Sequence, residues 1–226
     1  MKFLSLTVIA LLTTLFANSQ DQPVFNIFAG PQATTASYSI GGKKQETDMK
    51  IGFQAGIGMK VQIENKLYFA PAVYYSMKGY KVVYNTFNTL PDIDAKDNNT
   101  TIHTFETAAL LQYDFSANAN HFYIKGGPSL DFQLFGNENF NKMPSGSVDR
   151  KMKFSYGDYG HFSANAIAEL GYESNSGLII FAQYTHGLAS INNFDGGPQI
   201  KHRVFGISIG KYLNRKKIVI DTRNKE

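Results

Sequence analysis

One stretch of the chain alternates apolar and polar residues for longer than most strands of soluble proteins last. From Lys50 to Ile63 the odd-numbered residues are Ile, Phe, Ala, Met or Val, whereas the even-numbered residues are Lys, Gln or Gly. Successive side chains of a strand point to opposite faces of a sheet, while a helix would scatter both sets. The stretch therefore predicts a long β-strand with one apolar and one polar face.

The same alternation recurs along the chain and predicts about eight antiparallel strands. We place them at residues 24–35, 49–63, 67–84, 101–115, 121–134, 161–173, 178–190 and 199–212. Short turns (64–66, 116–120 and 174–177) alternate with longer polar loops (36–48, 85–100, 135–160 and 191–198). Bacterial outer-membrane barrels have an even number of strands, short periplasmic turns and longer extracellular loops. We therefore predict an all-β fold, a single up-and-down transmembrane β-barrel with both termini in the periplasm.

The start of the chain has the pattern of a secretory signal peptide. Lys2 supplies a positive charge, an apolar run from Phe3 to Phe16 follows, and Ala17-Asn18-Ser19 offers a small-x-small cleavage site. The apolar run is shorter than the roughly 20 residues that a spanning helix needs. We expect a signal peptide at 1–19, one barrel domain at 20–213 and a basic periplasmic tail at 214–226, in which Ile218-Val219-Ile220 leaves open a further short strand.

Composition excludes several classes of function. The 226 residues include no cysteine, so thiolate metal sites, thiol nucleophiles, disulfides and anchoring by an N-terminal lipidated cysteine are excluded. The formal net charge is +4, from 22 basic and 18 acidic residues that are interspersed along the chain. Nucleic-acid binding, which needs a concentrated basic surface, therefore gains no support.

Alternation alone leaves open whether the apolar face meets lipid or fills the core of a soluble, lipocalin-like barrel. The polar face favours lipid outside, because it is rich in glycine, whereas a soluble surface favours charged residues. These glycines, which suit the narrow lumen of an eight-stranded barrel, are Gly52, Gly56, Gly58, Gly127, Gly171, Gly206 and Gly210. Aromatic residues on the apolar face predict two membrane girdles, with Phe69, Tyr113, Phe122 and Tyr172 at one rim and Tyr75, Phe105, Phe132 and Tyr184 at the other.

The polar face also carries four lysines and four carboxylates. A buried charge without a partner costs several kcal/mol, so we predict that these groups pair inside the lumen, although some could face water at strand ends. We assign Lys50, Lys78, Glu106 and Asp131 to the extracellular half, and Lys60, Asp114, Lys125 and Glu169 to the periplasmic half. Each half then contains two positive and two negative charges and could neutralise itself.

The segment KIGFQAGIGMKVQIENKLYFAPAVYYSMKGY, from Lys50 to Tyr80, combines a Gly-rich strand, a short polar turn, an aromatic strand and a closing Lys-Gly. Similar patterns occur in FYIKGGPSL (Phe122 to Leu130), AELGYES (Ala168 to Ser174) and RVFGISIGKYL (Arg203 to Leu213). Together these segments resemble the PorT-like outer-membrane β-barrel family of Gram-negative bacteria. The resemblance implies a surface barrel, linked in a few members to protein secretion, and implies no catalytic residues.

Candidate metal ligands do not converge in this topology. The alternation turns His161 and His202 inward and His103 and His186 outward at the extracellular rim, with His121 at the opposite end, so no three histidines meet. The acidic loop with Asp92, Asp94 and Asp97 lacks the glycine and the final glutamate of an EF-hand loop. We therefore predict no metal site and no cofactor.

The longest loop mixes basic and aromatic residues, which suits contact with anionic sugars or with a protein. These residues are Lys142, Arg150, Lys151 and Lys153 together with Phe140, Phe154, Tyr156 and Tyr159.

We expect a non-enzymatic barrel with a polar-filled lumen, without a wide channel, that acts through its extracellular loops. Its expected partners are outer-membrane lipid, the barrel insertion machinery and an extracellular or secretion-machinery protein, but no nucleic acid. Two alternatives remain. A lipid- or acyl-modifying enzyme at the extracellular rim would need an apolar pocket there and could draw on Ser155, Ser163, Ser190 and Asp158. A soluble periplasmic carrier would need its apolar residues inside.

Overall fold

The computed structural model describes residues 22–86 and 89–214. The predicted signal peptide and nearly all of the predicted tail, including Ile218 to Ile220, lie outside the described residues. Among those that are described, no helix has the length and apolar character to cross a membrane.

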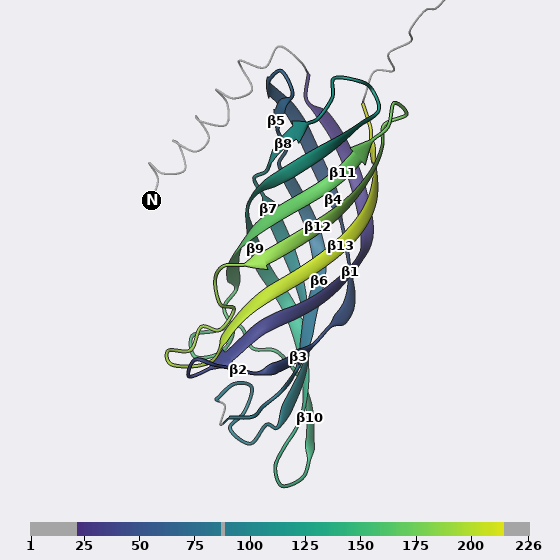
Figure 1. The fold of residues 1–226 in the computed structure, drawn as a ribbon. Coiled ribbons are helices and arrows are strands. Elements are labelled where there is room, and N and C mark those ends of the chain that lie inside the picture. The colour runs from purple at the N-terminus through teal and green to yellow at the C-terminus, as the bar shows by residue number, and fades with distance from the viewer. Residues whose placement is uncertain (1–21, 87–88, 215–226) are drawn as a thin grey trace, which may run out of the picture.

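Eight spans form the wall of a closed barrel in which neighbours pair antiparallel (Figure 1). The first strand, β1, pairs with the last strand, β13, on one side and with β4 on the other, and β9 pairs with β7, β8 and β11. In chain order the spans are β1 (Val24–Ile40), β4 (Lys50–Glu64), β5 with β6 (Leu67–Phe69 and Ala72–Val83), β7 with β8 (Asp97–Ala108 and Leu111–Asp114), β9 (His121–Asn141), β11 (Phe162–Glu173), β12 (Leu178–Gly187) and β13 (Gln199–Tyr212). The predicted all-β up-and-down barrel is confirmed.

Two predicted strands, 67–84 and 101–115, are each divided in two. Pro71 has no N–H to donate, and it lies between β5 and β6. The wall stays closed at these breaks through isolated hydrogen bonds, from Ala70 N to Leu110 O (2.8 Å) and from Ala109 N to Pro128 O (3.0 Å). The breaks therefore interrupt the regular ladder without opening the barrel.

The sheet continues past the barrel at the end with the long loops (Figure 1, lower end). Residues predicted as loops at 36–48 and 135–160 extend β1 to Ile40 and β9 to Asn141, and they add β2 (Lys43–Lys44), β3 (Glu46–Asp48) and β10 (Ser147–Lys151). The short added strands β2, β3 and β10 contain only polar residues apart from Val148, so they lack the alternation on which the prediction relied.

The apolar face of the barrel points outward. Ile51 is 76% exposed and Ile57 is 59% exposed, whereas Gln54, between them on the same strand, is 1% exposed. Of the predicted girdle residues, Tyr113, Phe122, Phe105, Phe132 and Tyr184 are exposed, and Phe69, Tyr172 and Tyr75 are half-buried. A soluble carrier with an apolar interior and a polar surface is therefore contradicted.

Glycine on the inner face makes room for large side chains that cross the lumen. A Cβ atom on Gly171 would lie 2.3 Å from the Tyr123 ring, and one on Gly56 would lie 2.2 Å from the Cβ atom of Tyr74. Both tyrosines are at most 3% exposed. Small residues at these positions thus allow aromatic packing inside a barrel of this width.

The lumen also contains two apolar clusters, so polar side chains fill only part of it, which corrects the expected polar-filled lumen. One cluster closes the loop end and is built by Ala36, Tyr38, Tyr80, Val82, Leu90, Ile102, Met152, Tyr159, Ile191 and Ile200. The second contains Phe28, Tyr74, Ala108, Leu110, Tyr123, Ile167, Ile179, Phe181 and Tyr212. Tyrosine allows this mixture because its ring packs with apolar groups while its hydroxyl reaches a polar partner.

Candidate functional site: the lumen and the loop end

The most deeply buried ion cluster is centred on Lys78 of β6. Its ammonium donates to Glu106 Oε2 at 2.7 Å and to both carboxylate oxygens of Asp131 at 2.8 Å. Ser129 donates to Glu106, and the Asn165 amide donates to Asp131 Oδ2 at 3.0 Å. Lys78, Glu106 and Asp131 are at most 2% exposed. One cation therefore holds two carboxylates that are cut off from water, and we call these five residues the Lys78 cluster.

A second cluster lies at the end with the short turns. Lys60 donates to Asp114 Oδ2 at 2.7 Å and to both oxygens of Glu173 at 3.0 Å. His121 Nε2 lies 3.0 Å from Asp114 Oδ2 and 3.4 Å from Glu173 Oε2. Gln112 donates to both carboxylates at 2.7 Å, and the Tyr212 hydroxyl donates to Glu173 at 2.7 Å. We call these six residues the Lys60 cluster.

Asp114, His121 and Glu173 are close enough to share a metal ion, since their ligand atoms lie within 4.8 Å of one another. The same carboxylate oxygens, however, accept hydrogen bonds from the Lys60 ammonium. A divalent ion at this point would have to displace that ammonium. The two carboxylates therefore already have partners within the protein. Lys60 supplies one nitrogen group, and His121 Nε2 supplies the second.

The structure groups the predicted lumen charges differently from the prediction. Lys125 of β9 pairs with Glu169 of β11 at 3.0 Å as a separate cross-strand pair. Lys50 joins neither cluster, which corrects its assignment to the upper network. Its ammonium contacts Asn99 Oδ1 (2.6 Å), Thr100 O (3.0 Å) and Thr101 Oγ1 (2.6 Å). Lys50 follows directly on the short break between β3 and β4, where strand alternation is not yet regular.

Sequence reasoning missed Glu173 and His121 as members of the Lys60 cluster. Glu173 shares its face of β11 with Glu169, and His121 shares its face of β9 with Lys125, so counting every second residue would have found both. The expected inward direction of His161 was wrong. His161 precedes β11, is exposed and stacks on Phe132 with ring centroids 5.6 Å apart. His202, also expected to point inward, is fully buried.

The loop end is held together by its own buried contacts. Glu138 accepts from Arg150 Nε at 2.7 Å and from the Tyr159 hydroxyl at 2.9 Å, and Arg150 Nη2 also donates to Pro91 O at 2.8 Å. The Tyr38 hydroxyl donates to Leu90 O at 2.9 Å. These bonds join β1, β9 and β10 to the loop that contains Leu90 and Pro91 and to the loop that contains Tyr159. We call this assembly over the barrel mouth the loop cap.

A family model for the outer membrane protein beta-barrel domain matches residues 16–193. The chain belongs to this family. The solved structure of Ail, the attachment invasion locus protein of Yersinia pestis, is similar at 14% identity, over 85% of this chain and 100% of that one, with a TM-score of 0.44. OprG from Pseudomonas aeruginosa is similar at 12% identity, over 87% and 99%, with a TM-score of 0.46. None of the curated protein sequences matches.

The hydroxyl groups of this outer-membrane barrel that could serve a rim enzyme already have local hydrogen-bond partners. Ser155 donates to Asp158 at 2.7 Å within one exposed turn, and Ser190 accepts from the backbone N–H groups of Asn192 and Ile200. Ser163 is buried and its hydroxyl contacts Ala189 O at 3.4 Å. The upper lumen is apolar, as such an enzyme requires, but the barrel's own side chains fill it.

The acidic loop does not assemble a calcium site. Asp92 pairs with Lys142 at 2.7 Å, while Asp97 accepts from the backbone and side-chain amides of Asn141 at 2.8 Å. Lys142 and Arg150, two of the basic residues expected to meet a partner, are therefore already paired within the loop cap.

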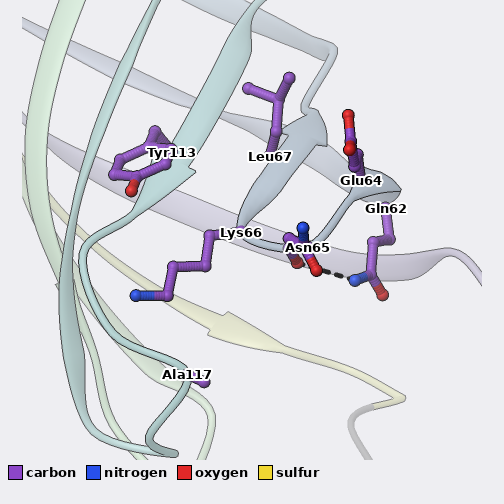
Figure 2. A pocket seen from close by; sticks show the side chains of 7 residues that line it. All are labelled: Gln62, Glu64, Asn65, Lys66, Leu67, Tyr113 and Ala117. Carbon is purple, nitrogen blue, oxygen red and sulfur yellow. Dashed lines mark hydrogen bonds between the residues drawn. The ribbon is translucent and has the colours of Figure 1, made fainter.

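A shallow pocket of about 550 Å³ lies at the other end of the barrel, beside the β4–β5 turn (Figure 2). Figure 2 shows turn side chains around it, and Gln62 donates to Asn65 O at 2.8 Å across its edge. Its lining is Gln62, Glu64, Asn65, Lys66, Leu67, Tyr113 and Ala117. This lining offers no nucleophile beside a base, so the pocket does not suggest catalysis.

Proposed function

We propose that the protein is a non-enzymatic outer-membrane barrel with a closed lumen, which acts through its loop end in binding or in a structural role in the envelope. The observation that carries this proposal is the filling of the lumen. The upper apolar cluster, the Lys78 cluster, the lower apolar cluster and the Lys60 cluster occupy it with side chains that are mostly less than 10% exposed. A barrel filled in this way supports presentation of its loops, and not diffusion of solutes through its lumen.

The loop cap supports the same role. Binding residues are often carried by loops on a rigid scaffold. Here Glu138, 1% exposed, fixes Arg150 and Tyr159, so the cap is ordered by bonds of its own. Large apolar side chains remain at its surface, including Tyr156, which is 85% exposed, and Met143, which is 61% exposed. Such residues suit a protein partner.

We further propose that the loop end faces the outside of the cell and that both ends of the barrel domain face the periplasm. The described ends of the chain meet at the end with the short turns, where Phe25 N donates to Asn214 Oδ1 at 2.8 Å and Leu213 N donates to Phe25 O at 2.8 Å. Short turns lie on the periplasmic side in bacterial barrels. The sequence resemblance extends this proposal to a PorT-like role with a secretion-machinery protein as partner.

Orientation can be tested directly because the chain has no cysteine. Ser145→Cys in the β9–β10 turn and Asn175→Cys in the β11–β12 turn each introduce a single thiol. A membrane-impermeant maleimide on intact cells should label Ser145→Cys and leave Asn175→Cys unlabelled until the outer membrane is opened. The reverse pattern would contradict the orientation.

The closed lumen is tested separately by conductance in planar bilayers. We expect the purified full-length barrel to give at most small, rare current steps, because buried side chains fill the lumen. Steady porin-sized steps would overturn the proposal.

A further inference from the structure

The outer face of three adjacent strands collects positive charge near the loop end. The register places His186 of β12 beside Arg203 of β13, and places Arg203 and Lys201 beside Thr35 and Ser37 of β1. The outward-facing residues of these strands are every second residue, and none of them is Asp or Glu. The basic side chains are thus set among hydroxyl groups, without a carboxylate from their own strands.

Arg203 is held in place by the wall beneath it. Its Nη1 atom donates to Gly187 O at 3.1 Å and to His202 O at 2.8 Å. These bonds use one nitrogen of a guanidinium group that has five N–H donors and a planar shape suited to phosphate oxygens. A fixed arginine loses less freedom when it binds an anion than a freely moving one does.

A row of small outward-facing residues begins beside this basic group and continues along β1. The outward residues of β1 here are small, namely Ala29, Pro31 and Ala33, and we call this row the β1 furrow. The residues on both sides of this row have larger, exposed side chains. Phe205 (51%) lies opposite Ala33 on the β13 side, and Phe53 (47%) lies opposite Pro31 on the β4 side.

We propose that this face binds a membrane lipid with a phosphorylated headgroup. Arg203 and Lys201 hold the phosphate, and one acyl chain lies in the β1 furrow between the side chains of β13 and β4. β3 brings Glu46 and Asp48 to the neighbourhood of β1, with Thr35 Oγ1 contacting Asp48 O at 3.3 Å. The headgroup therefore sits on the β13 side, away from those carboxylates. This site lies on the barrel wall and does not depend on the role of the loops.

The test is native mass spectrometry of the full-length barrel in detergent, titrated with lipid A carrying two phosphates or with the same lipid after dephosphorylation. The wild type should bind the phosphorylated lipid, and the dephosphorylated lipid more weakly. Lys201→Gln with Arg203→Gln should weaken binding of the phosphorylated lipid by about tenfold or more, because two charge-assisted contacts are lost. Lys211→Gln is the matched control, since Lys211 is an exposed, outward lysine at the other end of the same strand.

Ala33→Leu tests the furrow while leaving both basic residues in place. It adds bulk on the lipid-facing side, so the barrel should fold, as checked by heat-modifiable electrophoresis, but should bind the phosphorylated lipid more weakly. Equal binding of both lipids by the wild type would overturn the proposal. So would a double variant that binds the phosphorylated lipid as the wild type does, or a loss as large in Lys211→Gln.

Discussion

The two ion clusters of the lumen use similar groups in different surroundings. In the Lys78 cluster one ammonium serves two carboxylates, all at most 2% exposed, below the apolar cluster that closes the mouth. In the Lys60 cluster the carboxylates have two nitrogen groups, Lys60 and His121, and lie near a turn at the barrel end. Buried ion pairs are balanced between desolvation and attraction, so losing the only cation should matter more than losing one of two.

The largest effect is expected for Lys78→Met. The variant leaves Glu106 and Asp131 buried together without a positive charge, and removing one partner of a buried pair typically costs about 3–5 kcal/mol. Unfolding by urea in lipid vesicles measures this loss. The control is a triple variant that adds Glu106→Gln and Asp131→Asn, which should recover most of the stability because no unpaired charge remains. A loss below about 1 kcal/mol for Lys78→Met would show that water reaches the cluster.

Lys60→Met should cost less, about 1–3 kcal/mol, because His121, Gln112 and Tyr212 still contact the carboxylates. A double-mutant cycle with His121→Gln sharpens the comparison. If His121 replaces part of the lost charge, the double variant should lose clearly more stability than the two single variants added together. Simple additivity would mean that His121 does not act as the second cation, and the contrast between the clusters would fail.

The alternation in the sequence was sufficient to assign most of these groups to the inner face, and the structure buries Lys78, Glu106, Asp131, Lys60 and Asp114. It could not predict which charges meet. Lys60 reaches Glu173 across strands that are far apart in sequence, and such contacts depend on strand tilt and register. Alternation also failed where the strands are irregular, at Lys50 after the β3–β4 break and at His161 before β11. The apolar cluster that closes the loop end was not predicted, because four of its residues come from loops.

The loop cap contains a third group of paired charges, which is more exposed to solvent than the two clusters of the lumen. Arg150 is partly exposed, but Glu138 is 1% exposed and has Arg150 and Tyr159 as partners. Glu138→Gln should therefore destabilise the cap by about 1–2 kcal/mol without unfolding the barrel, since a charge-assisted bond is replaced by a neutral one. Limited proteolysis should show faster cleavage near β10 while heat-modifiable migration is kept. Glu46→Gln, an exposed carboxylate on β3, is the control and should leave the cleavage rate unchanged.

The smallest effect is expected for the partly exposed pair Asp92–Lys142. The Lys142 ammonium, together with the Asp94 N–H, holds the pKa of the Asp92 carboxyl below its ordinary value. A carboxyl whose pKa is lower in the folded protein contributes stability above its unfolded pKa of about 4, and loses it as the pH falls through the folded pKa. Asp92→Asn should therefore speed proteolysis of the loop slightly at pH 7, consistent with about 0.5 kcal/mol, and the difference from wild type should disappear in strong acid.

Asp94→Asn is the matched control for this pair, because Asp94 contacts Asp92 through its backbone N–H and not through its carboxylate. It should behave as the wild type at both pH values, with pepsin used for the acidic measurement. Since the pair is partly exposed, added salt at pH 7 should also reduce the difference between wild type and Asp92→Asn. A difference that persists in acid would mean that Asp92 acts through its hydrogen bonds alone. The Asp92–Lys142 pair would then not contribute to stability through its charges, and it could not be compared with the Lys78 cluster as a weaker ion pair.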